Sequence, residues 1–299
     1  MAKKTKKTGI EELEYYRINW FPGHMNKAIK EIKSNIKMVD IVLEVRDARS
    51  PLASGNKENY ATNSDKPYLI VINKTNMADP ATVKLWDEWF KKKEESYIFV
   101  NALDKTSVKS IVKRAKDILH AHRLKSNPDG VTKTKMKMMI LGLPNTGKST
   151  IINRLANRDA SKAAAKPGQT KGQLWVKVDK ELDLLDTPGV MPPRIDKELH
   201  GMWLSVIHAI PDHIVTPDFS ACFLIEHLLR IKAAGFKDQY KFETLDGLDL
   251  IQACDHIGKI RGCLRPGGGY DYDHIYKIVL NDFRKGLLGK ISFGVPPKR

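Results

Sequence analysis

Cysteine is scarce in this chain of 299 residues, and the three that occur follow no recognisable spacing. Cys222, Cys254 and Cys263 are scattered and include no C-x-x-C pair. An odd, sparse set of this kind argues against a disulfide framework and against a cysteine zinc site, and it is typical of reduced thiols in the cytosol. We interpret the three side chains as small buried apolar groups.

Long hydrophobic runs are also missing. No stretch reaches the length of a membrane span, and the start, Met-Ala-Lys-Lys-Thr-Lys-Lys, lacks the apolar segment of a secretory signal. We therefore expect a cytoplasmic protein without membrane association. Hydrophobic residues still make up 41% of the chain, which is enough for one α/β domain and a smaller second domain.

Acidic residues are too few to balance the basic ones. The chain has 35 Asp and Glu against 51 Lys and Arg, which gives a formal net charge of +16. An excess of this size indicates a polyanionic partner. A basic amphipathic helix with an aromatic apolar face would indicate an anionic membrane, but no such helix is evident in the sequence. RNA is the partner that the composition favours.

The most informative stretch is Gly142-Leu-Pro-Asn-Thr-Gly-Lys-Ser-Thr150, which contains the phosphate-binding pattern G-x-x-x-x-G-K-S. An apolar run precedes it and a helical pattern follows, which is the context that the pattern requires. Lys148 is expected to reach the β- and γ-phosphates, and the Ser149 hydroxyl to bind Mg²⁺. A glycine turn before a surface helix is the competing interpretation, and the flanking strand and helix disfavour it. The predicted nucleotide-binding residues here are Asn145, Thr146, Gly147, Lys148, Ser149 and Thr150.

Alternating strand and helix patterns continue to about residue 195. They predict an α/β fold with a doubly wound, mostly parallel sheet, whose phosphate-binding loops lie at the carboxyl ends of the strands. From residue 196 helical patterns dominate, with helices expected over 198–210, 220–234, 247–257 and 272–285. We expect a basic disordered tail over 1–17, the α/β domain over 18–195 and a smaller all-α, RNA-binding domain over 196–299.

The segment Asp186-Thr-Pro-Gly189 follows the last predicted strand. Asp186 is expected to hold Mg²⁺, and the Gly189 N–H to meet the γ-phosphate. Thr170, in the loop before this strand pair, is placed to cap Mg²⁺ when the γ-phosphate is present.

Two segments before the phosphate-binding loop are suited to reading a base. Asn73-Lys74-Thr-Asn76 is similar to the guanine-reading pattern N-K-x-D, and Asn101-Ala102 to the loop that touches the guanine oxygen. Together with the phosphate segments these are the parts of a GTPase. Their order is unusual, because the base-reading segments come first in the chain.

This order resembles the circularly permuted GTPases, in particular the ribosome biogenesis GTPase A family. Trp20-Phe-Pro-Gly-His-Met25 and Asp47-Ala-Arg-x-Pro51 also match that family, and the resemblance covers nearly the whole chain from Asn19. It implies a Mg²⁺-dependent enzyme that hydrolyses GTP to GDP. It also implies binding to the large ribosomal subunit and its rRNA, stimulation by that subunit, and a role late in its assembly. A monomer is the default expectation.

Two further assignments depend on the resemblance. Many GTPases place a glutamine after the Asp-Thr-Pro-Gly segment to orient water, but Val190 stands there, and His24 matches the histidine that is its candidate substitute in the family. Asn145 matches the asparagine that binds K⁺ beside the phosphates, where the cation neutralises developing charge. A structural histidine and an ordinary loop asparagine are the alternatives. The predicted catalytic set is His24, Lys148, Thr170 and Gly189.

Asn76 departs from the family pattern, which has aspartate there. A carboxylate accepts hydrogen bonds from both N1–H and N2–H₂ of guanine, whereas an amide offers one acceptor and sets its NH₂ against a donor. Asn76 suits xanthine better, because its NH₂ can donate to the 2-oxo group. Asp79 lies three residues further on and is not expected to substitute.

The principal alternative function is an RNA-binding assembly scaffold with a degenerate or altered-specificity nucleotide site. Asn76 and Val190 favour it, and the intact phosphate and Mg²⁺ set disfavours it. A small GTPase that acts on a protein or membrane partner is a third possibility, which the net charge disfavours. The basic, glycine-rich loop 261–270 is open to two interpretations, RNA contact or a simple turn.

Overall fold

The computed structural model describes residues 23–56, 64–126, 135–157, 174–192, 195 and 197–298. The predicted tail over 1–17 and the Thr170 loop lie outside the described residues. The chain divides into two compact units, one formed by Phe21–Arg194 with Ser292–Arg299 and the other containing Ile195–Ile291. We call them the sheet unit and the helical unit.

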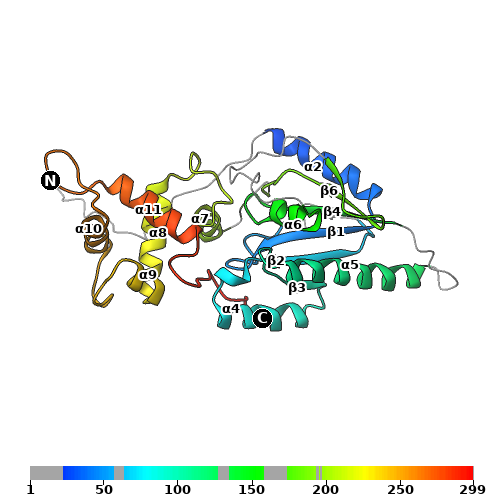
Figure 1. The fold of residues 1–299 in the computed structure, drawn as a ribbon, viewed down its shortest axis with the longest axis horizontal. Coiled ribbons are helices and arrows are strands. Elements are labelled where there is room, and N and C mark those ends of the chain that lie inside the picture. Colours follow the sequence, from blue (N-terminus) through cyan, green and yellow to red (C-terminus); the bar gives the residue numbers. More distant parts are fainter. Residues whose placement is uncertain are drawn as a thin grey trace, which may run out of the picture. The chain divides into compact units, whose positions relative to one another are not determined.

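A six-stranded sheet organises the sheet unit, with strand order β3-β2-β1-β4-β6-β5 (Figure 1). Every neighbouring pair is parallel except β5 and β6, which are antiparallel. This confirms the predicted α/β fold with its mostly parallel sheet. The strands are β1 Ile41–Asp47, β2 Tyr68–Asn73, β3 Tyr97–Phe99, β4 Met136–Gly142, β5 Leu174–Lys177 and β6 Leu182–Asp186. The helices are α2 Gly23–Asn35, α4 Pro80–Lys92, α5 Lys105–Ser126 and α6 Lys148–Leu155, with 3₁₀ turns η1 Ile36–Met38 and η2 Thr75–Met77.

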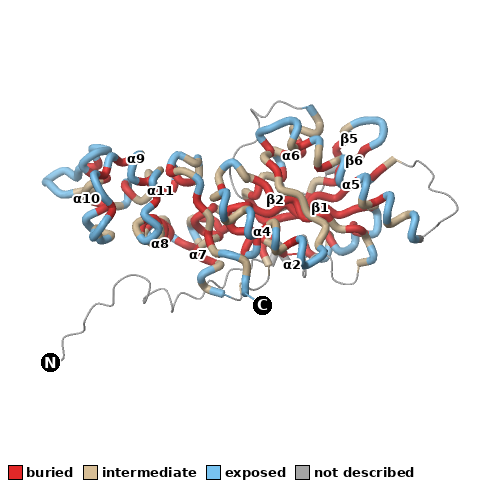
Figure 2. Tube along the Cα trace, turned by 90° about the horizontal axis from the view of Figure 1, so that it is seen from below, coloured by how far each residue is buried: buried red, intermediate tan, exposed pale blue. Residues whose placement is uncertain are grey.

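Both faces of the sheet are covered by helices, as β2 shows. Its alternate residues Leu69 and Val71 join a core cluster with α5 and α6, while Ile70 and Ile72 join a second cluster with Trp86 and Phe90 of α4. Successive side chains of a strand point to opposite faces, so both faces of β2 are apolar and buried. β1 is accordingly buried along its whole length, and β2 is buried everywhere after its first residue, Tyr68 (Figure 2).

The parallel strands bring four chemically important turns to one edge of the sheet. Asp47 pairs in register with Asn73 at the ends of β1 and β2, and β4 ends at Gly142 beside Val45. β6 ends at Asp186, in register with Ile140. Since carboxyl ends of parallel strands share an edge, segments distant in sequence meet there.

The helical unit contains α7 Glu198–Val206, α8 Pro217–Arg230, α9 Ala234–Gln239, α10 Leu250–Arg261 and α11 Tyr272–Arg284. Four of these helices were predicted, with shifted bounds. α8 begins earlier than expected because Pro217 suits the first helical turn. α10 begins later because Asp249 and Gln252 form a capping box at its start. The short α9 was not predicted, because six residues are too few to show a helical period.

The chain returns to the sheet unit at its end. Residues 292–299 belong to that unit, whereas the sequence interpretation carried the helical domain to residue 299. The physical reason is that Phe293 is buried there and its N–H donates to the Arg49 carbonyl at 2.6 Å. The helical unit is therefore an insertion between two parts of the sheet unit.

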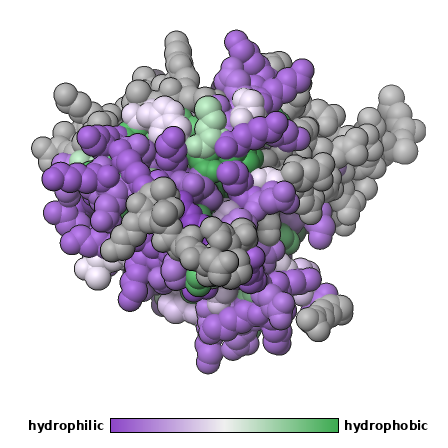
Figure 3. Space-filling view, turned by 90° about the vertical axis from the view of Figure 1, so that its right-hand side faces the viewer, coloured by the Kyte–Doolittle hydropathy of each residue, from purple (hydrophilic) through white to green (hydrophobic). Residues whose placement is uncertain are grey.

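The described surface seen in Figure 3 is dominated by hydrophilic side chains, with small hydrophobic areas between them. No helix in the described part of the chain has the length and apolar character to cross a membrane.

Candidate nucleotide-binding site

The loop between β4 and α6 has the geometry of a phosphate cradle. Gly147 caps the N-terminus of α6 with φ +102°. A Cβ there would lie 2.1 Å from Nδ2 of Asn73, so any side chain would collide with the neighbouring loop as well as strain the backbone. The sequence thus places glycine where the backbone must approach closely, and the helix N-terminus is directed into the loop.

Lys148 is buried at the start of α6, and no carboxylate of the described residues is in hydrogen-bond contact with it. Its ammonium donates to the carbonyls of Gly142 at 3.1 Å and Leu143 at 2.9 Å. Burial lowers the pKa of Lys148 to about 8, with Asp186 opposing the shift and Lys74 adding to it. A buried ammonium that donates to backbone carbonyls is suited to accept a phosphate anion.

Lys148 also gives the site a testable pH dependence. Phosphate contact favours the charged ammonium, so nucleotide binding above the free pKa of about 8 takes up a proton. We expect the affinity for GDP to be level below that pH and to fall above it by up to about tenfold per pH unit. Isothermal titration in two buffers of different ionisation heat measures both the affinity and the proton uptake.

The control for this measurement is the variant Lys148→Arg, because its guanidinium stays charged over the whole pH range. Any change of affinity that this variant shows with pH comes from other groups, such as the guanine base itself. A wild-type affinity that stays parallel to that of the arginine variant up to about pH 9, without proton uptake, would show that the pKa of Lys148 in the free protein is not lowered to about 8.

Ser149 and Asp186 supply the oxygen donors that Mg²⁺ prefers. Ser149 is exposed on α6, and Asp186 is partly buried at the end of β6. Burial raises the pKa of Asp186, and the charge of Lys148 opposes that shift. Among the described residues no cluster of three or more His, Cys, Asp or Glu could hold a metal. A hydroxyl and a carboxylate that lie beside a phosphate-binding loop are a donor set that fits Mg²⁺, which is commonly held by one or two protein oxygens together with phosphate oxygens.

The Asp186–Gly189 segment lies directly against the phosphate loop. A Cβ on Gly189 would be 2.9 Å from the Pro144 nitrogen and 3.0 Å from Nζ of Lys148. The hydroxyl of Thr187 donates to the Ile140 carbonyl at 2.7 Å, which anchors the turn to β4. The next side chain, Val190, is only 1% exposed, so it belongs to the core and cannot orient a water molecule.

Asn73 joins three loops at the base-reading side. Its Nδ2 donates to the Thr146 carbonyl at 2.9 Å, and its Oδ1 accepts from the Ala102 N–H at 2.9 Å. Ala102 belongs to the loop that is predicted to touch the guanine oxygen, and its N–H is engaged by Asn73 in this structure. The Oδ1 of Asn101 accepts from the Leu103 N–H at 3.0 Å and shapes the same loop.

Asn76 lies exposed in η2, the turn that follows Lys74. The nearby Asp79 caps α4, where its carboxylate accepts from the Thr82 N–H at 2.7 Å and from the Thr82 hydroxyl at 2.6 Å. A carboxylate committed to a helix cap is not available to read a base.

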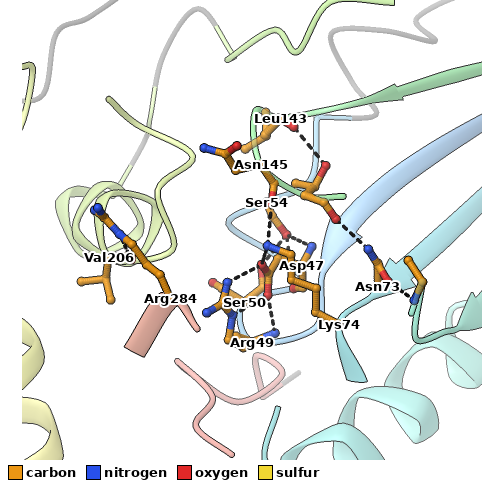
Figure 4. Close-up of polar contacts among 12 residues, drawn as sticks. Asp47, Arg49, Ser50, Ser54, Asn73, Lys74, Leu143, Asn145, Val206 and Arg284 are labelled. Carbon is orange, nitrogen blue, oxygen red and sulfur yellow. Dashed lines mark hydrogen bonds and ion pairs between the residues drawn. The ribbon is translucent and has the colours of Figure 1, made fainter. Parts of the chain in front are cut away.

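Sequence reasoning missed the role of the Asp47–Pro51 segment at the end of β1 (Figure 4). Asp47 is fully buried, and its carboxylate binds the Arg49 guanidinium at 2.8 and 2.9 Å and Nζ of Lys74 at 2.9 Å. Nζ of Lys74 also donates to the Asn145 carbonyl at 2.5 Å. The sequence offered the Asp47-Ala-Arg-x-Pro51 match to the resembled family at the end of a buried strand, but no contact that would give the segment a role.

Charge pairing fixes the ionisation of Asp47. Burial alone would raise the pKa of this carboxyl, but Arg49 and Lys74 hold it well below its ordinary value. Burial also lowers the pKa of Lys74. Arg49 and Lys74 therefore keep Asp47 in its charged form. Through the contact of Lys74 with the Asn145 carbonyl, the same residues connect the base-reading loop to the phosphate loop.

Two predicted catalytic residues stay outside this geometry. His24 lies in the first turn of α2, but its side chain is not among those described, and Thr170 falls in the undescribed stretch before β5. The described residues Asn73, Lys74, Asn145, Lys148 and Gly189 are brought together at one edge of the sheet by the contacts above.

Comparison with known proteins supports a nucleotide site. A family model described as 50S ribosome-binding GTPase matches residues 137–241. The chain is 37% identical over 279 residues to the ribosome biogenesis GTPase A of Bacillus cereus, covering 93% of this chain and 94% of that protein. It is 30% identical over 286 residues to the protein of the same name from Thermotoga maritima, covering 93% and 95%.

Two solved structures of YlqF from Thermotoga maritima share the fold. The GDP-bound structure matches with a TM-score of 0.61 at 25% identity and covers 89% of this chain and 99% of that one. The GNP-bound structure matches with a TM-score of 0.61 at 26% identity, with coverage of 90% and 98%.

Proposed function

Because this chain belongs to the ribosome biogenesis GTPase A family, we propose that it hydrolyses GTP on the large ribosomal subunit and couples the reaction to a late step of that subunit's assembly. Family membership makes it a GTPase of ribosome assembly. The further proposal is supported above all by one observation, the convergence of the phosphate loop, the Asp186–Gly189 turn and the base-reading loops at one edge of the sheet. In this proposal the protein acts in the cytoplasm as a monomer.

Each part of the site has a proposed role toward GTP. The N–H groups of the phosphate loop and α6 bind the phosphates, Lys148 neutralises the β- and γ-oxygens, and the Gly189 N–H contacts the γ-phosphate. GTPases of this family generally use Mg²⁺, which supplies positive charge to the phosphate oxygens when bound. Ser149, Thr170 and Asp186 are its proposed ligands. Asn73, Lys74, Asn76, Asn101 and Ala102 form the base side, and Thr146, Gly147 and Thr150 complete the phosphate side.

The catalytic proposal assigns the attacking water to His24. Val190 is buried and apolar, so the position used by glutamine in many GTPases is inert here. Asn145 is proposed to hold K⁺ beside the phosphates, in the left-handed conformation that its φ of +59° records. A cation at that position neutralises charge that develops on the leaving phosphate.

The permuted chain order offers a route from nucleotide state to RNA affinity. Asp186–Gly189 is followed directly by the crossing into the helical unit near Ile195, so a change at the γ-phosphate acts on that connection. The Thermotoga protein has been solved with both GDP and GNP, and we propose that this chain cycles between corresponding states.

The helical unit is the proposed RNA-binding part. Its loop after α10 is closed by a bridge between Leu264 and Tyr270, and it carries the half-exposed Arg265. Arginine and tyrosine beside an open glycine turn suit phosphate contact and base stacking. The net charge of +16 supplies the long-range attraction to rRNA.

Hydrolysis assays with purified protein in KCl test the proposal. GTP turnover is measured with and without large ribosomal subunits, with XTP and ATP in parallel. We expect slow intrinsic turnover of GTP and strong stimulation by subunits. Salt-dependent binding to subunits without turnover of any nucleotide would instead support the RNA-binding scaffold, which the exposed Asn76 and the buried Val190 favour.

A further inference from the structure

A second layer of residues lies behind the base-reading loop. Lys74, the first residue of that loop, is in the left-handed conformation with φ +68° and precedes η2, which carries Asn76. Its ammonium is fixed by Asp47 at 2.9 Å and by the Asn145 carbonyl at 2.5 Å. The orientation of Asp47 therefore sets where the loop begins.

Arg49 holds Asp47 in that orientation. Its backbone N–H donates to Oδ1 of Asp47 at 3.0 Å, its Nε to the same oxygen at 2.9 Å, and its Nη2 to Oδ2 at 2.8 Å. Arg49 is 1% exposed, so the fork is fixed within the protein and shielded from solvent. A planar guanidinium that binds both oxygens fixes the carboxylate in rotation as well as in position.

The end of the chain contacts this layer at two points. The Phe293 N–H donates to the Arg49 carbonyl at 2.6 Å, and the Phe293 ring is 1% exposed. The Ser292 hydroxyl accepts from the Asp79 N–H at 3.0 Å, directly before α4. Two consecutive residues thus contact Arg49, which binds Asp47 behind Lys74, and Asp79, which follows the segment that contains Lys74 and Asn76.

The remaining residues of the chain end are packed differently. Gly294 turns the backbone with φ +72°, and Val295 is 62% exposed. Between residues 295–298 and α4 lies an open groove of about 730 Å³, lined by Leu85, Trp89, Pro296 and Pro297 among others. Among the described residues 292–298, Ser292 and Phe293 make the hydrogen bonds to Asp79 and Arg49.

We infer that Arg49 is a positioning residue for base recognition and that Ser292 and Phe293, at the end of the chain, hold it in place. The inference rests on the proposed nucleotide site. It adds that residues 292 and 293, far away in the sequence, support the base-reading part of that site. It means that the base is read with full selectivity only when Ser292 and Phe293 make their contacts with Asp79 and Arg49.

Titration of nucleotides tests this inference. The measured quantity is the ratio of the dissociation constants for ADP and GDP, since both ligands share the phosphate contacts and differ in the base. We expect truncation after Ile291, Phe293→Ala and Arg49→Lys each to reduce this ratio by about tenfold, while binding of inorganic pyrophosphate is unchanged. Truncation after Gly294, which removes only residues 295–299, is the matched control and keeps the wild-type ratio.

Phe293→Leu is expected to restore most of the ratio lost in Phe293→Ala, because it refills the buried site. An unchanged ratio in Arg49→Lys and Phe293→Ala overturns the inference. A loss of GDP, ADP and pyrophosphate binding in equal measure also overturns it, since that result indicates general destabilisation. A wild-type protein that binds none of the three ligands overturns the proposed function itself.

Discussion

Asn76→Asp is expected to raise the affinity for GTP by about tenfold to a hundredfold, because hydrogen bonds to a charged group contribute about 1.5–3 kcal/mol. The wild-type amide offers guanine one acceptor, whereas a carboxylate accepts from both N1–H and N2–H₂. Asn76 is exposed in η2, so the new charge stays hydrated in the free protein and adds little strain. Competition titrations against a fluorescent GDP measure the change.

XTP serves as the matched control in the same titration. Its 2-oxo group accepts a hydrogen bond from the Asn76 NH₂, and a carboxylate at that position repels it. The affinity for XTP should therefore fall in Asn76→Asp while that for GTP rises. If the ratio of the two affinities is the same in wild type and variant, Asn76 does not read the base, and the assignment of η2 to the base side is wrong.

His24→Ala is expected to lose about a hundredfold or more of the subunit-stimulated turnover, with little change in the affinity for GTP. The reason is that no glutamine stands after Gly189, and the residue that does, Val190, is buried. A group from elsewhere must then orient the water, and the start of α2 carries the candidate. Single-turnover hydrolysis with saturating large subunits isolates this step from nucleotide and subunit binding.

Two further variants sharpen the test of His24. His24→Gln keeps a side chain that orients water without titrating, so it should retain part of the stimulated turnover. His120→Ala removes an exposed histidine on α5 and should leave turnover unchanged. Full stimulated turnover in His24→Ala would show that the water is positioned by another group, such as one supplied by the ribosomal subunit.

The sequence predicted those features that depend on local pattern. A continuous apolar run before Gly142 and a helical period after it were enough to predict the β4-loop-α6 unit, because parallel strands are buried on both faces. The alternation of such apolar runs with helical patterns was enough to predict a mostly parallel sheet. The helix bounds in the helical unit were less accurate, since a cap such as Asp249 depends on one residue rather than on a period.

The features that sequence reasoning missed depend on contacts between distant residues. Nothing in the neighbourhood of Phe293 indicates that its N–H meets the Arg49 carbonyl. Asp47 and Arg49 could be noted as a motif, but their role became visible only once Lys74 was placed beside them. The roles of His24, Thr170 and Asn76 stay predictions that the experiments above address.

The return of residues 292 and 293 to the sheet unit has a consequence for the order in which the sheet unit folds. Ser292 and Asp79 are 213 residues apart, so their contact closes a long loop, whose entropy cost must be met before the contact stabilises anything. The core of the sheet can form before this contact, because its six strands all lie within residues 41–186. The support behind Lys74 is therefore expected among the last contacts to form. On the inference above, selection of the base is then a late property of the folding chain, acquired after the phosphate loop has its structure.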